Sequence, residues 1–235
     1  MREPNVSELE QAIIRNCSPT LAGLKPASLF TFPGSFIEDG DAKAPNRAIE
    51  NRSHLRRAAD ACARQLATAG IRLRILVWRA CGALVYVYRP EMLSGHLADP
   101  CAAEPLRAEG YPVGNLEPCI AMLAARIAEA GKRAVTENGE IGRSTEEPRP
   151  CPCSEGACRR EFPHELGYFL GYPYADVAEF IRQHGENYLE FGMWKIYTER
   201  ERALETFARY KRCTRSMIRA YRRRGRLEGL AVRVR

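Results

Sequence analysis

A histidine and a glutamate stand next to each other in the segment Glu161–Pro173, directly after Pro163. Proline is favoured at the first helical position, so His164 and Glu165 are expected in the first turn of a helix. There the helix dipole stabilises a carboxylate and favours neutral imidazole, which offers a nitrogen to a ligand, a metal ion or a proton. The alternative is that Glu165 caps free helix amides and His164 packs against Tyr168.

Cys17 is a second candidate for chemistry, because it lies where a helix is expected to break at Ser18 and Pro19. A nucleophilic cysteine needs a base, and His164 is the histidine in a comparably distinctive segment. Cys17 as nucleophile, with His164 and Glu165 as further catalytic candidates, would make a hydrolase or transferase. The alternative is a cysteine buried in the core. Thr20 could bind an anionic group.

Lys25 follows in the same loop as Cys17 and is a second candidate for an anion contact. Alternatively, its methylene chain covers the core while the ammonium group reaches water.

Three cysteines lie close together at Cys151, Cys153 and Cys158, with His164 six residues further on. Thiols and an imidazole are ligands for zinc or an iron–sulfur cluster. The single-residue gap between the first two thiols strains tetrahedral geometry, which favours adventitious binding. No cofactor is predicted from these residues.

The net charge of +7 is concentrated at the C-terminal end. Residues 200–235 contain thirteen Lys and Arg against three Glu, which leaves a net charge of −3 for the other 199 residues. Binding of RNA, DNA or anionic lipid is therefore possible only through this basic end of the chain. The alternative is a solvated helix end with a frayed tail. The helix pair around Gly171 has the size of a helix-turn-helix, but Asp176 and Glu179 would repel phosphate, which favours a packed helical hairpin.

Periodicity and capping residues predict both helices and strands. Ser7 and Glu10 form a capping box that starts a helix, which must end before Pro19. Further helices are predicted over residues 55–69, 116–130, 164–170, 175–184 and 198–225. Strands are predicted in a hairpin over residues 71–89 and over residues 187–197. The expected fold class is α+β, with a small antiparallel sheet packed against helices on one face.

Composition suggests how these elements divide the chain. Residues 132–160 are poor in apolar side chains and are expected to form a flexible linker or insertion. Residues 1–131 and 161–213 would be the two parts of one domain, followed by a basic tail over residues 214–235. With 45% hydrophobic residues, the chain has enough apolar material for a sizeable core.

Three separated motifs are specific enough for a family resemblance. They are the segments 16–30, 161–173 and 192–197. In this order they resemble the bacterial domain-of-unknown-function family 3793 over roughly Leu9 to Cys213, although Met193 stands where an aromatic residue is expected. The resemblance implies no established activity. It directs attention to a ligand-binding set within the motifs, namely Cys17, Thr20, Lys25, His164, Glu165, Trp194 and Lys195.

The location and function follow from the same features. No apolar run approaches the ~20 residues that span a bilayer. No secretory signal is evident, so the expected location is the cytoplasm. In that compartment the nine cysteines are expected to be thiols or ligands. The favoured function is an accessory protein that binds a small ligand or a protein partner in a groove between the Cys17 loop and the His164 helix. The Cys/His enzyme and the nucleic-acid-binding tail are the alternatives.

Overall fold

A three-stranded antiparallel sheet stands at the centre of the computed structural model, which describes residues 5–37, 46–137 and 162–233. Its strands are β1 (Ala27–Pro33), β2 (Arg72–Arg79) and β3 (Gly82–Tyr88), in the order β1-β3-β2. The predicted hairpin over residues 71–89 is confirmed as β2 and β3, and the α+β class is confirmed with it. The third strand, β1, was not predicted.

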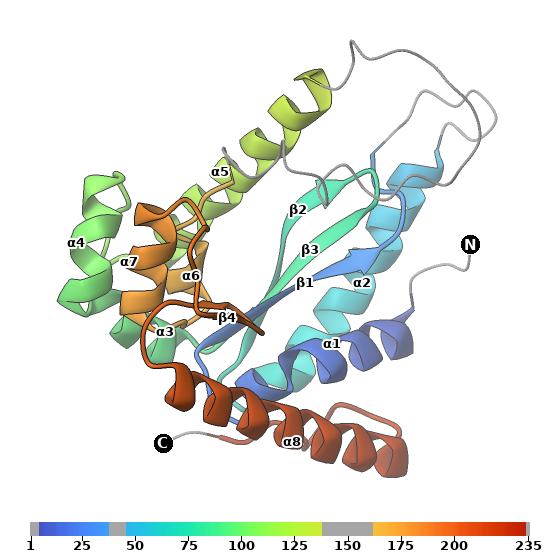
Figure 1. Ribbon diagram of the computed structural model, residues 1–235. Coiled ribbons are helices and arrows are strands. Elements are labelled where there is room, and N and C mark those ends of the chain that lie inside the picture. The colour runs from blue at the N-terminus through green and yellow to red at the C-terminus, as the bar shows by residue number, and fades with distance from the viewer. Residues whose placement is uncertain (1–4, 38–45, 138–161, 234–235) are drawn as a thin grey trace, which may run out of the picture.

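The central strand β3 supplies both cores of the molecule. All seven of its residues are buried. Ala83, Val85 and Val87 enter one apolar cluster, whereas Leu84, Tyr86 and Tyr88 enter a second cluster on the opposite face. Because both faces carry apolar side chains, helices cover both, as Figure 1 shows. The expectation of helices on one face was therefore wrong.

The first helical layer consists of α1 (Val6–Leu21), α2 (Arg47–Ala67) and the C-terminal half of α8 (Arg200–Arg224). The N-cap of helix α1 is Asn5, whose side chain accepts a hydrogen bond from the Glu8 amide, rather than Ser7 of the predicted capping box. It also continues through Pro19 to Leu21. Helices α1 and α8 lie side by side (Figure 1).

The second layer consists of the five helices that the described residues form between β3 and β4. They are α3 (Pro90–Ala98), α4 (Pro100–Ala108), α5 (Leu116–Glu137), α6 (Leu166–Phe169) and α7 (Tyr174–Arg182). The proposed linker over residues 132–160 begins inside α5, and residues 138–160, which include Cys151, Cys153 and Cys158, lie outside the described residues. The division of the chain into domain parts stays a prediction.

A small hairpin connects the two layers. Strands β4 (Glu190–Phe191) and β5 (Lys195–Ile196) pair only with each other, so the strand predicted over residues 187–197 is a separate two-stranded sheet. Trp194 and Ile196 pack against Phe207 on the N-terminal half of α8, together with Leu24 from the loop after α1. The hairpin therefore lies where the loop after α1, α7 and α8 meet.

The C-terminal segment is part of the core. Helix α8 ends at Gly225, whose left-handed backbone (φ +71°) turns the chain back toward α1. Leu227 and Leu230 are then buried in the first cluster, and the Val232 amide donates a 2.9 Å hydrogen bond to the Leu21 carbonyl. The segment predicted as a basic tail over residues 214–235 thus also contributes two leucines to the core.

Candidate functional site

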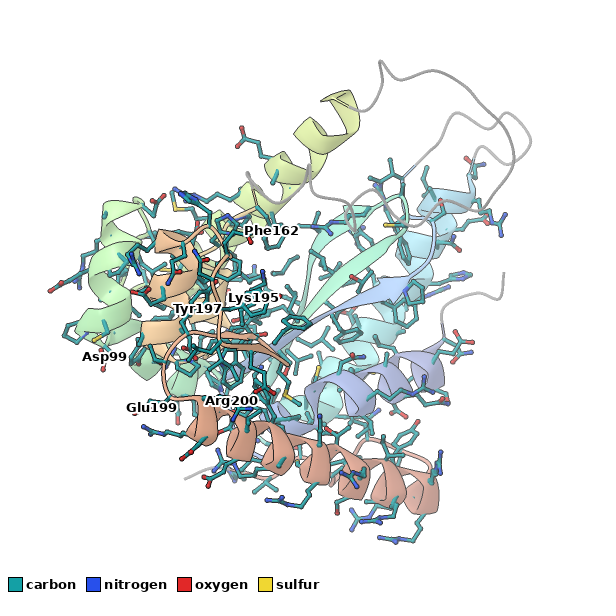
Figure 2. The ribbon with its side chains drawn as sticks, viewed as in Figure 1. Asp99, Phe162, Lys195, Tyr197, Glu199 and Arg200 are labelled. Carbon is teal, nitrogen blue, oxygen red and sulfur yellow. The ribbon has the colours of Figure 1, made fainter. Side chains whose placement is uncertain are left out.

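A cavity of about 240 Å³ lies between α6, α7 and the β4–β5 hairpin. It brings together His164, Trp194 and Lys195, three of the predicted ligand-binding residues, from two motifs far apart in the sequence. Phe162 and Lys195, which both line it, are labelled in Figure 2. Its remaining walls are mainly apolar: Pro163, Leu166, Gly167, Leu170, Tyr172, Asp176, Val177, Phe180 and Phe191.

Aromatic rings form much of this cavity wall. The imidazole of His164 meets the ring of Phe180 edge to face, with 5.2 Å between ring centroids. Two further lining residues, Tyr172 and Trp194, have ring centroids 5.1 Å apart. The ammonium group of Lys195 is held by two contacts: its Nζ donates to the Gly185 carbonyl and lies 4.4 Å from the Tyr188 ring centroid. The surface of the cavity is thus almost wholly apolar, although a histidine and a lysine are among the residues that line it.

A buried carboxylate, Asp176, fixes the relative position of the cavity walls. Only 3% of Asp176 is exposed. Its Oδ2 accepts a 2.8 Å hydrogen bond from the indole of Trp194, and its Oδ1 accepts from the amides of Tyr197 and Thr198 at 2.9 and 3.0 Å. The Thr198 hydroxyl donates a fourth bond of 2.9 Å. These four donors satisfy the charge, so Asp176 joins α7 to the segment between β5 and α8.

From the sequence, Asp176 was expected only to repel phosphate, and its role as a buried acceptor was not predicted. An available signal was its position in the first turn of a helix after Pro173, where a carboxylate is favoured. Its actual partners come from a segment about twenty residues later, and no local pattern identifies them.

The side chain of Glu165 does not line the cavity that contains Trp194; it binds other side chains instead. Its buried carboxylate accepts hydrogen bonds from the Tyr111 hydroxyl at 2.8 Å and from Arg126 Nη1 at 2.7 Å. Burial, with the Glu165 charge beside it, raises the pKa of Tyr111 well above its usual range. Glu165 is thus held by side chains rather than by helix amides, while His164 lines both the cavity and a second hollow on the Glu165 side.

Cys17 is completely buried in the first apolar cluster. Burial raises the pKa of its thiol well above the usual range, although Lys25 and Ser28 oppose the shift, so the thiolate needed for nucleophilic attack is strongly disfavoured. Cys17 packs in the cluster that contains Val85, whereas helix α6, directly after His164, packs in the cluster that contains Tyr86. Cys17 and the His164 segment therefore belong to opposite faces of the sheet.

The loop after α1 nevertheless contacts Tyr172, a residue that lines the cavity. The Nζ atom of Lys25 lies 5.2 Å from the ring centroid of Tyr172, whose ring lines the cavity. Gly171 has φ +68°, and a Cβ there would come within 2.4 Å of two Pro26 ring carbons, so the α6–α7 turn packs closely on this loop. Burial lowers the pKa of Lys25 to about 8, with Cys17 opposing the shift.

Thr20 also takes part in local packing, because its Oγ1 lies 2.8 Å from the Ser28 Oγ. Cys17, Thr20 and Lys25 do not line the cavity, so the structure brings together His164, Trp194 and Lys195 but not the Cys17 end of the predicted set. Among the described residues, no three His, Cys, Asp or Glu side chains are arranged to hold a metal ion.

The fold and the cavity define an α+β protein whose central sheet lies between two helical layers and whose hairpin closes an apolar site. The chain belongs to the family "Protein of unknown function (DUF3793)", whose model matches residues 13–231. The resemblance drawn from the three motifs is thereby confirmed. No curated protein and no solved structure matches the chain. In the described part of the chain, no helix is long and apolar enough to cross a membrane.

Proposed function

We propose that this protein is a cytoplasmic bacterial accessory protein that binds a small aromatic ligand with an anionic group in the cavity beside His164. The observation that carries the proposal is the convergence of His164, Trp194 and Lys195 on one apolar space. Aromatic walls favour a flat apolar ligand, and the Lys195 ammonium favours a negative group. At about 240 Å³, the cavity is smaller than the ~300–1,000 Å³ of drug-sized sites.

A cytoplasmic location is supported by the cysteines. Among the described residues, the cysteines at positions 17, 62, 101, 119 and 213 are free thiols. Free thiols are typical of a reducing compartment. The Cys/His enzyme receives no comparable support, because Cys17 is buried and belongs to the opposite face of the sheet from α6.

The proposal can be tested with naphthalene-2-sulfonate, a small aromatic anion, and its neutral analogue 2-naphthalenemethanol. Isothermal titration calorimetry should show saturable binding of the anion with one site per chain. Phe191→Ser should weaken binding at least fivefold, because Phe191 lines the cavity while 69% of it is exposed, so folding is little affected. Leu189→Ser is the matched control, since Leu189 is 60% exposed on the same hairpin and does not line the cavity.

The role of Lys195 is tested separately. Lys195→Met should weaken binding of the sulfonate more than binding of the alcohol, because only the sulfonate gains from the ammonium charge. The proposal fails if neither compound binds saturably, or if the Phe191 and Leu189 variants lose affinity equally. Native mass spectrometry of the purified protein would identify a small molecule that remains bound during purification.

A further inference from the structure

Six basic side chains lie on one side of the last helix. They are Lys211, Arg212, Arg215, Arg219, Arg222 and Arg223, and all are exposed. At about 100° per residue they fall within an arc of roughly 120° around the helix axis. The buried residues Phe207, Tyr210 and Tyr221 point to the other side. The charges therefore form one continuous face, which we call the α8 basic face.

The number of charges is larger than helix capping requires. A helix C-terminus carries a partial charge of roughly −0.5, which one or two cations would balance. No Asp or Glu occurs between Glu205 and Glu228, so the sequence supplies no neutralising partner within this stretch. Just beyond the helix end, Arg226 pairs with Glu228 at 3.5 Å. Among the described residues, the six charges of the face themselves have no carboxylate partner, so they are available to a binding partner.

The α8 basic face is held in place by the core beneath it. The Tyr221 hydroxyl donates a 2.9 Å hydrogen bond to Glu10 of α1, and Leu227 and Leu230 are buried beyond the helix end. A groove of about 380 Å³ between α1 and α8 lies beside it, lined by Arg15 and Arg222 among others. Because α8 is packed rather than free, its charges are already arranged before a partner arrives.

The spacing and chemistry of the face indicate which polyanion fits. From Lys211 to Arg223 the helix rises about 18 Å, or roughly one positive charge per 3 Å, close to the ~3.4 Å per phosphate along one strand of a duplex. None of the exposed large apolar side chains of the described residues lies on α8. The face thus lacks the apolar groups that enter a bilayer and the aromatic rings that stack on single-stranded bases.

We propose that the α8 basic face binds the phosphate backbone of duplex nucleic acid without sequence preference. The site is distinct from the cavity beside His164, and the two proposals stand or fall separately. Binding releases counterions, so affinity falls steeply with salt. Four to six phosphate contacts would give a slope of about −4 to −5 for the logarithm of the binding constant against the logarithm of salt concentration.

The test is fluorescence anisotropy of the full chain with a labelled random-sequence DNA duplex of 24 base pairs, in 50–200 mM KCl. Arg215→Glu with Arg219→Glu should weaken binding at least tenfold and reduce the salt slope by about 2, because two phosphate contacts are lost. The matched control is Arg57→Glu with Arg107→Glu. It changes the net charge equally at exposed positions on α2 and α4, and should change affinity less than twofold.

Two competing polyanions are measured at equal phosphate concentration: a 24-nucleotide single strand, and vesicles of phosphatidylserine and phosphatidylcholine. The proposal predicts that the duplex binds more tightly than either. Equal weakening by the two double variants would overturn it, as would absence of duplex binding at 50 mM KCl. Preferential binding of vesicles would assign the α8 basic face to a membrane surface instead, and preference for the single strand would exclude the duplex.

Discussion

The indole nitrogen of Trp194 donates a 2.8 Å hydrogen bond to the carboxylate of Asp176, eighteen residues earlier in the chain. Both partners are buried, and both line the same cavity. The bond joins the β4–β5 hairpin to α7, so the shape of the cavity depends on a polar interaction between its walls. Removing the acceptor tests stability and binding together.

Asp176→Ala should lower the free energy of unfolding by about 3 kcal/mol, because it leaves four donors without their charged acceptor in a buried position. For a chain of this size, that loss corresponds to a decrease in Tm of roughly 6–12 °C. Urea denaturation followed by Trp fluorescence would measure it. Asp60→Ala, at an exposed position on α2, is the control and should change stability by less than about 0.5 kcal/mol.

Arg126 allows two carboxylates to be compared at one guanidinium group. Its Nη1 contacts Glu165, whose side chain is 10% exposed, and Glu109, whose side chain is 57% exposed. Glu165→Ala should cost about 2–4 kcal/mol, because Arg126 and Tyr111 lose a buried acceptor. Glu109→Ala should cost less than about 1 kcal/mol. Chemical denaturation of both variants, with a double-mutant cycle to Arg126→Met, would measure the two contributions. Equal costs for Glu165→Ala and Glu109→Ala would contradict the larger contribution of the buried pair.

The C-terminal segment should be necessary for stability. Deleting residues 226–235 removes the buried side chains of Leu227 and Leu230 and the Val232 carbonyl that Arg89 contacts at 2.6 Å. The loss should be about 3–6 kcal/mol, since burying one leucine contributes roughly 1.5–3 kcal/mol. The control, Arg222→Gln with Arg223→Gln, removes exposed charge only. If the deletion and the Arg222/Arg223 variant unfolded thermally at the same Tm, the segment would contribute no stability beyond its charge.

Lys25 should make stability depend on pH. Its pKa is about 8 in the folded protein and 10.5 in the unfolded chain, so between these values the unfolded state binds more protons. The contribution of Lys25 is therefore most unfavourable below pH 8 and is relieved as the pH rises toward 10.5. Lys25→Met should stabilise the protein at pH 7 and lose this advantage by pH 10.5. Guanidinium denaturation at several pH values measures this trend, and a difference between Lys25→Met and the unchanged protein that did not vary with pH would contradict it.

The cysteines should react in two groups. Cys81 and Cys101 are exposed and should be alkylated by iodoacetamide at pH 8 before unfolding. Cys17 and Cys62 should react only in denaturant, because burial raises the pKa of both thiols, that of Cys62 to about 12. Peptide mass spectrometry would measure the order. Labelling of Cys17 ahead of Cys81 and Cys101 would revive the nucleophile hypothesis.

Local patterns identified much of the fold. The alternation around Ile75 and the apolar run through Val85 predicted β2 and β3, because a strand buried on both faces needs apolar side chains on both. Strand β1 was missed although Phe30 and Phe32 alternate in it. Helices α3 and α4 were not predicted, although Pro90 and Pro100 are each at a first helical position, where the missing amide costs nothing.

The candidate site was predicted only in part, because local patterns show unusual motifs but not which segments meet in space. His164, Trp194 and Lys195 belong to motifs of unusual composition, and the cavity gathers all three. The partners of buried charges were not predictable, because they depend on which segments meet in space. Glu165 is bound by residues 39 and 54 positions earlier, and no local periodicity carries that information.

The packing of α1 against α8 has a consequence for how the chain folds. Glu10 and Tyr221 are separated by 211 residues, yet their side chains meet in the first core layer. Contacts between such distant residues form slowly, because a long loop must close before they stabilise anything. The apolar face of α1 is thus incompletely covered until α8 arrives. Partly folded intermediates of this protein should therefore be the species most prone to aggregate, and the ones that a chaperone would recognise.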